Sequence, residues 1–322
     1  MIKKVLSYFS KILVVFVALT ASSVYAQTTY PSKPIRLIVP WGPGGGADIM
    51  GRLVGRWLET DLKGTVVVMN QPGATGSIGL RKLVDEGADG HTLGVLTGDT
   101  LTLGAFPEQL FNVSNTVALG IMIRQPSCLF ARFDGPFKTW DDVIAAAKAK
   151  PGSINVAITG PNSPDELTIK YLETKGLKMV TVPYAKPGER FVAAIAGHVE
   201  LLYEQAGDLK AHIESKKLRP LIFFDNKRAP EPFANVPVSA DYGYEVLLPQ
   251  TRSILAKKGI DQRIIDRISD SLNRYSKTPE FANYLRDQYA LPDSFVGAKD
   301  AQKFLENEVA SFKKILEIVN KK

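Results

Sequence analysis

Two glycine-rich loops hold the residues of this chain that are best suited to binding a small anion. The first loop spans Trp41 to Asp48 and the second spans Pro72 to Ser77. Glycine lets main-chain N–H groups approach a ligand closely, and a helix that begins after such a loop adds partial positive charge. The loops therefore predict a carboxylate-binding site. Their candidate ligand-binding residues are Trp41, Gly42, Pro43, Gly44, Gly45, Asp48, Gly73, Ala74, Thr75 and Gly76.

Asp48 has a different expected role from its neighbours in the first loop. A carboxylate aimed at a bound anion would repel it. We therefore expect Asp48 to cap the following helix or to order the loop, and so to support the site from behind.

Three short segments with the residue types of β-strands position these loops. They are Ile35–Val39, Thr65–Met69 and Leu93–Leu96, and the stretches between them have apolar residues at helical spacing. Strands that alternate with helices predict a parallel, doubly wound sheet with right-handed crossovers. Ligands of such sheets bind at the carboxyl ends of the strands, so both loops and Thr97 should converge on one site.

A second α/β segment follows Pro126. Its loop from Thr159 to Ser163 joins a predicted strand, Ile154–Ile158, to a helix, and Thr159, Asn162 and Ser163 are candidate ligand contacts. Ser163 followed by a proline is also typical of a simple helix N-cap. Both roles fit the sequence.

Other predicted elements are helices at Thr139–Lys150, Ile260–Ser276 and Lys299–Val319, strands at Met179–Val182, Val199–Tyr203 and Leu218–Phe224, and a surface loop at Lys227–Pro237.

The first 26 residues have the pattern of an export signal. Lys3 and Lys4 precede an apolar run from Ile12 to Leu19, and small residues before Gln27 predict cleavage after Ala26. The run is shorter than the roughly 20 residues that span a bilayer, which disfavours the alternative of a retained anchor.

The charge of the chain limits its candidate partners, and its cysteine content limits its covalent cross-links. The formal charge is +7, and three lysines lie in the signal, which leaves +4 for the rest of the chain. Without a run of like charges, this mild excess predicts no nucleic-acid partner, although it would assist capture of an anion. Cys128 is the single cysteine, so no internal disulfide can form, and its apolar neighbours predict a buried thiol.

The sequence supports a catalytic function less well than it supports a binding site. Gly42, Gly44 and Ala47 fit the dinucleotide-binding pattern G-x-G-x-x-A, but Pro43 removes an N–H from that turn and the second strand is followed by Asn70, where an acid would be needed. The three histidines belong to no hydrolase or metal-binding motif. We therefore predict no catalytic residue, no metal and no cofactor.

An ordered series of short motifs resembles the tripartite tricarboxylate transporter receptors, also called Bug proteins. The series covers essentially all of the chain after the signal. Its motifs are Tyr30–Pro40, Pro43–Gly45 with Asp48, Asn70–Ala74 with Gly76 and Gly79, Asp89–Leu93, Pro151–Asn155, Val182–Tyr184 and Gly197–Val199.

The resemblance implies a two-lobed α/β periplasmic binding protein of type II-like architecture. Each lobe would be a sheet flanked by helices, and the chain would cross the hinge twice. Lobe 1 is expected to comprise residues 27–126 and 247–322, and lobe 2 residues 127–246. The family's binding mode implies that a carboxylate is held mainly by main-chain groups of the two glycine loops, while residues near Tyr184 and Glu204 contact its far end.

The implied function is a monomeric periplasmic receptor that delivers a small carboxylate to membrane transporter subunits. Di- and tricarboxylates, aromatic acids, acidic amino acids and neutral vitamins are all candidate ligands. The chain departs from the family at Asp165–Glu166, where relatives commonly have x-His, and at Ala185–Gly188, where a Gly-Ser is frequent. These positions fall where ligand specificity should be set. A same-fold protein that feeds a sensor and a periplasmic enzyme remain the alternatives.

Overall fold

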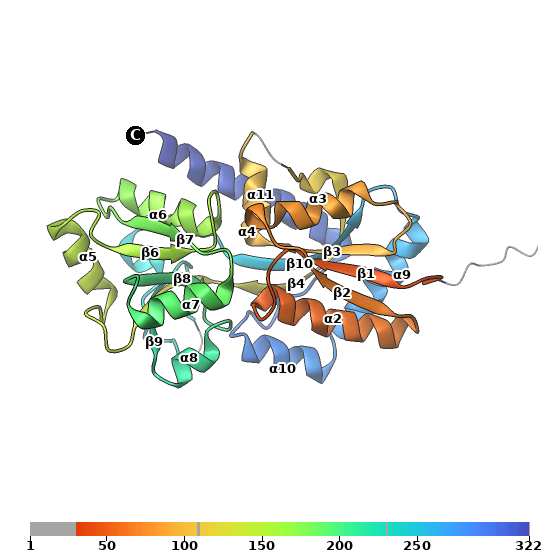
Figure 1. The fold of residues 1–322 in the computed structure, drawn as a ribbon, viewed down its shortest axis with the longest axis horizontal. Helices are drawn as coiled ribbons and strands as arrows, with labels where there is room; N and C mark the ends of the chain where they lie inside the picture. The colour runs from red at the N-terminus through yellow and green to blue at the C-terminus, as the bar shows by residue number, and fades with distance from the viewer. Residues whose placement is uncertain (1–29, 108–109, 230, 322) are drawn as a thin grey trace, which may run out of the picture.

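The computed structural model describes residues 30–107, 110–229 and 231–321. Two sheets lie beside each other along the long axis, and helices cover both (Figure 1). This arrangement confirms the predicted two-lobed α/β fold. The predicted signal peptide, residues 1–26, lies outside the described residues.

The sheet of lobe 1 has the strand order β11-β4-β10-β3-β1-β2. Its strands are β1 (Ile35–Val39), β2 (Val66–Asn70), β3 (Thr92–Thr97), β4 (Thr116–Gln125), β10 (Gln250–Lys257) and β11 (Val296–Gly297). β1 runs parallel to β2 and β3, as predicted, but β10 is antiparallel to both β3 and β4. The parallel arrangement predicted for the first three strands is therefore confirmed, and β10, which returns from lobe 2, adds a strand of opposite direction.

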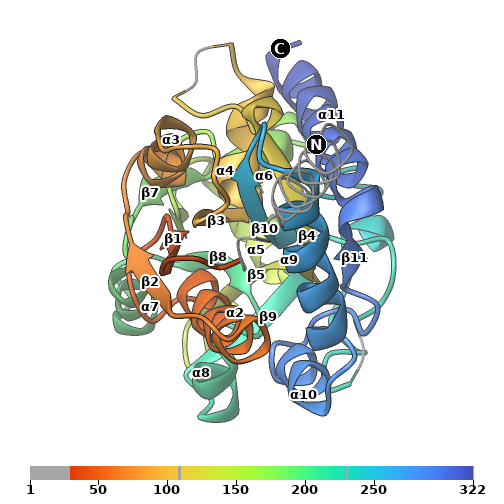
Figure 2. The same cartoon turned by 90° about the vertical axis from the view of Figure 1, so that its right-hand side faces the viewer.

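Helices cover both faces of this sheet, which Figure 2 shows from the end. One face packs against α2 (Gly46–Leu62), α9 (Gln262–Tyr275) and α10 (Pro279–Asp287). The other face packs against α3 (Ser77–Asp85), α4 (Gly98–Thr102) and α11 (Ala298–Asn320). Three short 3-10 turns connect these elements among the described residues. Ala74–Gly76 follows β2, Leu103–Ala105 follows α4, and Val113–Asn115 precedes β4.

The sheet of lobe 2 has the order β7-β6-β8-β5-β9. Its strands are β5 (Ser127–Arg132), β6 (Asn155–Ile158), β7 (Val180–Pro183), β8 (Leu201–Gln205) and β9 (Leu218–Phe223). Helices α5 (Trp140–Ala149) and α6 (Pro164–Thr174) cover one face, and α7 (Pro187–Ala196) and α8 (Lys210–Glu214) the other. Cys128 on β5 is fully buried, which confirms the prediction of a buried thiol.

One apolar core continues from lobe 1 into lobe 2. It includes Leu96 of β3, Leu305 of α11 and Tyr203 of β8. Helix α11 contributes to both parts, because it packs on α4 and on α6 (Figure 1). The C-terminal helix therefore ties one side of the two lobes together.

The chain passes from the first sheet to the second at Pro126 and returns before β10, after a 3-10 turn at Ser239–Tyr242. The boundaries given above for the lobes stay a prediction, and we keep them as working definitions. Residues 227–237 lack a regular helix or strand where the structure describes them, but Phe233 is 3% exposed and packs on Phe223 and Tyr289. The segment is therefore the largely exposed loop that its proline content predicted, and Phe233 anchors it to the core.

Candidate ligand-binding site

A small cavity lies between the lobes and collects side chains from both. Its volume is about 40 Å³, well below the roughly 300–1,000 Å³ of most small-molecule pockets. A ligand larger than a few water molecules can therefore enter only if the lobes separate. The residues that line this interlobe cavity are Trp41, Gly45, Gly46, Ala47, Thr97, Asp99, Thr159, Asp165, Pro187, Arg190, Glu204, Gln205, Asp208, Gln250 and Arg252.

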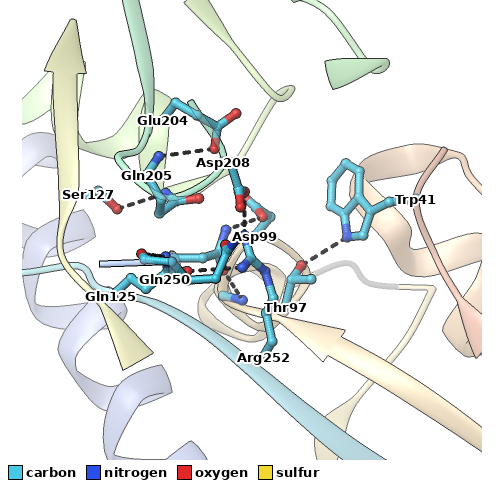
Figure 3. Close-up of polar contacts among 12 residues, drawn as sticks. Trp41, Thr97, Asp99, Gln125, Ser127, Glu204, Gln205, Asp208, Gln250 and Arg252 are labelled. Carbon is cyan, nitrogen blue, oxygen red and sulfur yellow. Dashed lines mark hydrogen bonds and ion pairs between the residues drawn. The ribbon is translucent and has the colours of Figure 1, made fainter. Parts of the chain in front are cut away.

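The first glycine-rich loop forms one wall of the interlobe cavity through the N-terminus of α2. Gly45 is the N-cap residue of this helix and provides no side-chain cap, so the first N–H groups of the helix remain available to an anion. Trp41 is fixed beside them, because its Nε1 donates a hydrogen bond to Thr97 Oγ1 at 3.0 Å (Figure 3). The structure thus brings three of the predicted residues together at the cavity: Trp41, Gly45 and Thr97.

Asp48 holds the loop in shape. Its carboxylate accepts hydrogen bonds from Gly44 N at 3.0 Å, from Arg52 Nε at 3.0 Å and from Asn70 Nδ2 at 2.9 Å. Burial alone would raise the pKa of Asp48, but these hydrogen bonds and the Arg52 charge bring it below its usual value. Asp48 therefore orders the loop and does not cap the helix. Asp48, Gly42, Pro43 and Gly44 lie outside the cavity lining.

The second glycine-rich loop lies at the rim, where it joins the lobes. Thr75 Oγ1 donates to the carbonyl of Pro161 at 3.1 Å, across the interface. Thr75 is itself held by Thr100, whose Oγ1 donates to the Thr75 carbonyl at 2.9 Å. Gly73, Ala74, Thr75 and Gly76 all have positive φ, and none of them lines the cavity.

The lobe 2 loop contributes one residue to the cavity lining. Thr159 lines the cavity, and its N and Oγ1 both donate to Asp165 Oδ2 at 2.8 Å. Ser163 is the N-cap of α6 and accepts from Glu166 N at 3.3 Å, with Pro164 at the start of the helix. The capping role predicted for Ser163 is confirmed, while Ser163 and Asn162 lie outside the cavity lining.

Tyr184 and Glu204, which were predicted to contact the far end of the ligand, lie at different distances from the cavity. Glu204 on β8 lines the cavity. Tyr184 lies behind it, where its carbonyl accepts from Arg190 NH1 at 3.0 Å. Tyr184 therefore contacts Arg190, a residue of the cavity lining, through its main chain.

Buried charged and amide side chains, most of which sequence reasoning missed, complete the cavity. Arg190 pairs with Glu204 and Arg252 pairs with Asp208, each with a nitrogen–oxygen distance of 2.5 Å. All four of these side chains are 3–6% exposed. The Arg252–Asp208 pair joins β10 of lobe 1 to the loop after β8 in lobe 2 (Figure 3). The charged and amide cavity residues that the sequence analysis did not name as ligand contacts are Asp99, Asp165, Arg190, Gln205, Asp208, Gln250 and Arg252.

Some of these residues had a usable sequence signal. Asp99 and Asp208 follow β3 and β8 by two and three residues, so the strand-end rule that selected Thr97 applies to them as well. Arg190 lies within a helix and Arg252 within a strand that the sequence analysis did not predict. Nothing local in the sequence marks either arginine as part of a site.

Burial controls the protonation of the acidic residues. Burial raises the pKa of Asp165 to about 8, with a further contribution from the nearby charge of Asp99. The pKa of Asp99 is also raised by burial. Burial raises the pKa of Asp208 to about 6, although the Arg252 charge lowers it in part. Burial of the cavity therefore favours the protonated forms of Asp99 and Asp165.

Comparison with known proteins agrees with this architecture. Residues 50–321 match the model of the tripartite tricarboxylate transporter family receptor. Protein BugT of Bordetella pertussis is 29% identical over 270 residues, 82% of each chain. The structure of MatC from Rhodopseudomonas palustris with bound malate has a TM-score of 0.81 at 19% identity, and covers 89% of this chain and 99% of its own. The R. palustris protein Rpa4515 with adipate has a TM-score of 0.82 at 21% identity, with coverages of 90% and 98%.

The fold and the interlobe cavity define a two-lobed periplasmic binding protein. Within that class, the chain belongs to the tripartite tricarboxylate transporter receptor family, which includes the Bug proteins. The family is one of solute-binding receptors.

In the part of the chain that the structure describes, no helix has both the length and the apolar character needed to cross a membrane. The same residues include no cluster of three or more His, Cys, Asp or Glu side chains arranged to hold a metal ion.

Proposed function

We propose that this chain is an exported receptor that captures a small organic carboxylate between its lobes and delivers it to the membrane subunits of a tripartite tricarboxylate-type transporter. In this proposal residues 1–26 are a signal peptide that is cleaved after Ala26. The mature chain acts in the periplasm as a monomer, and it binds its ligand without chemical change.

The observation that carries the proposal is the uncapped N-terminus of α2 at the cavity wall. Gly45, Gly46 and Ala47 line the cavity, and the N–H groups of such a helix end favour a negative ligand. The malate and adipate bound to the two structural neighbours support a carboxylate as the ligand class.

The two lobes would close on the ligand. Thr75–Pro161 and Asp208–Arg252 are contacts between lobes, so they can form only when the lobes approach. Hinge-bending proteins present a different outer surface when closed. A membrane subunit that recognises the closed form would select the loaded receptor. In this proposal Gly42–Gly45 and Gly73–Gly76 contact the carboxylate, while Thr159, Asn162, Ser163, Tyr184 and Glu204 face its far end.

Isothermal titration of residues 27–322 with mono-, di- and tricarboxylates, aromatic acids and amino acids tests the binding step. We expect one-to-one binding that is confined to one chemical group. Gly46→Ala should weaken it at least tenfold, because a Cβ there would lie 2.3 Å from both Arg252 NH2 and Asp208 Oδ1. Gly87→Ala is the matched control, since a Cβ at Gly87 would have nothing within 4 Å. Binding to none of these acids would overturn the carboxylate assignment.

A deletion strain separates transport from the two alternatives. Loss of uptake of the bound acid, restored by the wild-type gene, supports delivery to a transporter. Unchanged uptake with a lost transcriptional response would favour a sensor. Recovery of a chemically altered ligand after incubation with the pure protein would favour an enzyme.

A further inference from the structure

The interlobe cavity has more acidic side chains than basic ones. Four carboxyl groups and two guanidinium groups line it. Glu204 is paired with Arg190, and Asp208 is paired with Arg252. The remaining two carboxyl groups, Asp99 and Asp165, have no ion-pair partner among the described residues, although both are at most 4% exposed.

Asp99 and Asp165 come from opposite lobes and meet through one hydroxyl group. Thr159 Oγ1 lies 3.2 Å from Asp99 Oδ1 and 2.8 Å from Asp165 Oδ2. A hydroxyl has one proton to donate, so it can serve only one of the two carboxylates. The other donors are neutral: Gln250 Nε2 reaches Asp99 Oδ2 at 2.6 Å, and Thr159 N reaches Asp165. Closing the lobes thus places two carboxyl groups together, and neither forms an ion pair among the described residues.

A second observation shows an acceptor in the same cavity that lacks a donor. Oδ1 of Asp208 has no hydrogen-bond partner among the residues that the structure describes, although its side chain is 6% exposed and its Oδ2 is bound to Arg252. A buried carboxylate oxygen without a donor is costly. Nε of Arg190 is likewise an unpartnered donor in the cavity lining. Among the described residues, the cavity therefore offers one unused acceptor and one unused donor to whatever it encloses.

We propose that the ligand carries a cationic nitrogen in addition to its carboxylate, as an α-amino acid does, and that this nitrogen binds among Asp99, Asp165 and Asp208. The inference rests on the proposed function, because it assumes that the N-terminus of α2 holds the ligand carboxylate. An ammonium group has three N–H donors and would compensate the two unpaired carboxyl groups. A dicarboxylate without nitrogen would instead bring negative charge beside two carboxyl groups that have no ion-pair partner among the described residues.

Proton movement distinguishes the two kinds of ligand. The charged groups that act on the Asp99–Asp165 pair are Arg190 of α7, Glu204 of β8 and Arg252 of β10. A bound ammonium group favours the ionised form of both carboxyls, so protons leave on binding. A nitrogen-free acid favours the protonated forms, so protons are taken up. Titrations in buffers of different ionisation enthalpy measure the sign of this transfer.

The test compares each L-amino acid with its deaminated counterpart, for example L-aspartate with succinate and L-glutamate with glutarate. We expect one amino acid to bind at least tenfold more tightly than its counterpart, with proton release at pH 7. Asp165→Asn and Asp99→Asn should each reduce this ratio at least fivefold. Asp134→Asn, at a lobe 2 carboxylate whose side chain is 81% exposed, should leave it unchanged, and thermal unfolding of each variant checks its fold.

The outcomes separate this inference from the proposed function. If a nitrogen-free acid binds as tightly as its amino counterpart, or binds with proton uptake, the proposed function stands and the inference is wrong. A shift produced by Ca²⁺ or Mg²⁺ alone would also overturn it, because the acidic residues would then serve a metal ion. If neither series binds, the proposed function is overturned, and the inference with it.

Discussion

Gly207→Ala should prevent the lobes from closing without affecting either lobe alone. Gly207 lies in lobe 2, directly after β8, and faces the end of α10 in lobe 1. A Cβ at this position would lie 2.3 Å from the carbonyl oxygen of Gln288 and 2.4 Å from its Cα. The Gln288 carbonyl is held by Gln125, whose Nε2 donates to it at 2.6 Å. The neighbour is therefore backbone and cannot rotate away.

The size of the effect follows from that overlap. Forcing an extra methyl group into a packed contact costs about 1–3 kcal/mol, which corresponds to a roughly 5- to 150-fold change in an equilibrium. Because the overlap exists only when the lobes meet, this cost should reduce ligand affinity. The unfolding temperature of the unliganded protein should change little.

Isothermal titration and thermal unfolding of Gly207→Ala and Gly87→Ala provide the assay. The alanine at position 87 makes no contact within 4 Å, so that variant should bind as the wild type does. Wild-type affinity in Gly207→Ala, with a normal fold, would refute the claim that the lobes meet at Gly207 in the liganded protein.

Three further predictions concern the cavity and its first loop. Arg252→Met should weaken binding at least tenfold, since it leaves Asp208 buried without its cation when the lobes close; wild-type affinity of this variant in isothermal titration would contradict this. At Gly44 φ is +85°, which a leucine disfavours, so Gly44→Leu should distort the first glycine-rich loop and abolish binding while the fold stays largely intact. Isothermal titration measures the binding and circular dichroism the fold. With the lobes closed, the contribution of Asp165 to the unfolding free energy should fall as pH rises from about 4 to about 8, because the pKa of Asp165 is higher in the folded chain than its value of 3.8 in the unfolded chain and the folded state binds the extra proton. In denaturant titrations the unfolding free energy of the wild type, relative to that of Asp165→Asn, should fall over this pH range, and a constant difference would remove Asp165 as the cause.

The sequence was informative where one local pattern specified one element. The first two strands were predicted to within one residue, because each joins a β-branched run to a glycine loop, and the third prediction, Leu93–Leu96, falls within β3. Ser163 and Pro164 marked the start of α6 for the same reason, since capping is a local interaction.

The cavity chemistry was mostly not predictable, because it depends on pairs that are distant in sequence. Arg252 meets Asp208, and Asp99 meets Thr159 only when the two sheets face each other. A buried arginine inside a strand has no local signature. β4 and β10 were also missed: both are buried on both faces, so neither has the alternating pattern of a half-exposed strand.

The most direct test of the account is a titration of the mature chain with carboxylates, followed by recovery of the ligand. A ligand present at 100 times its dissociation constant adds about 2.7 kcal/mol of stability, so thermal unfolding identifies the class to titrate. The account predicts saturable one-to-one binding of one carboxylate class, weakened by Gly46→Ala, and recovery of the ligand unchanged. Absence of binding by folded, ligand-free protein, or recovery of an altered compound, would contradict it.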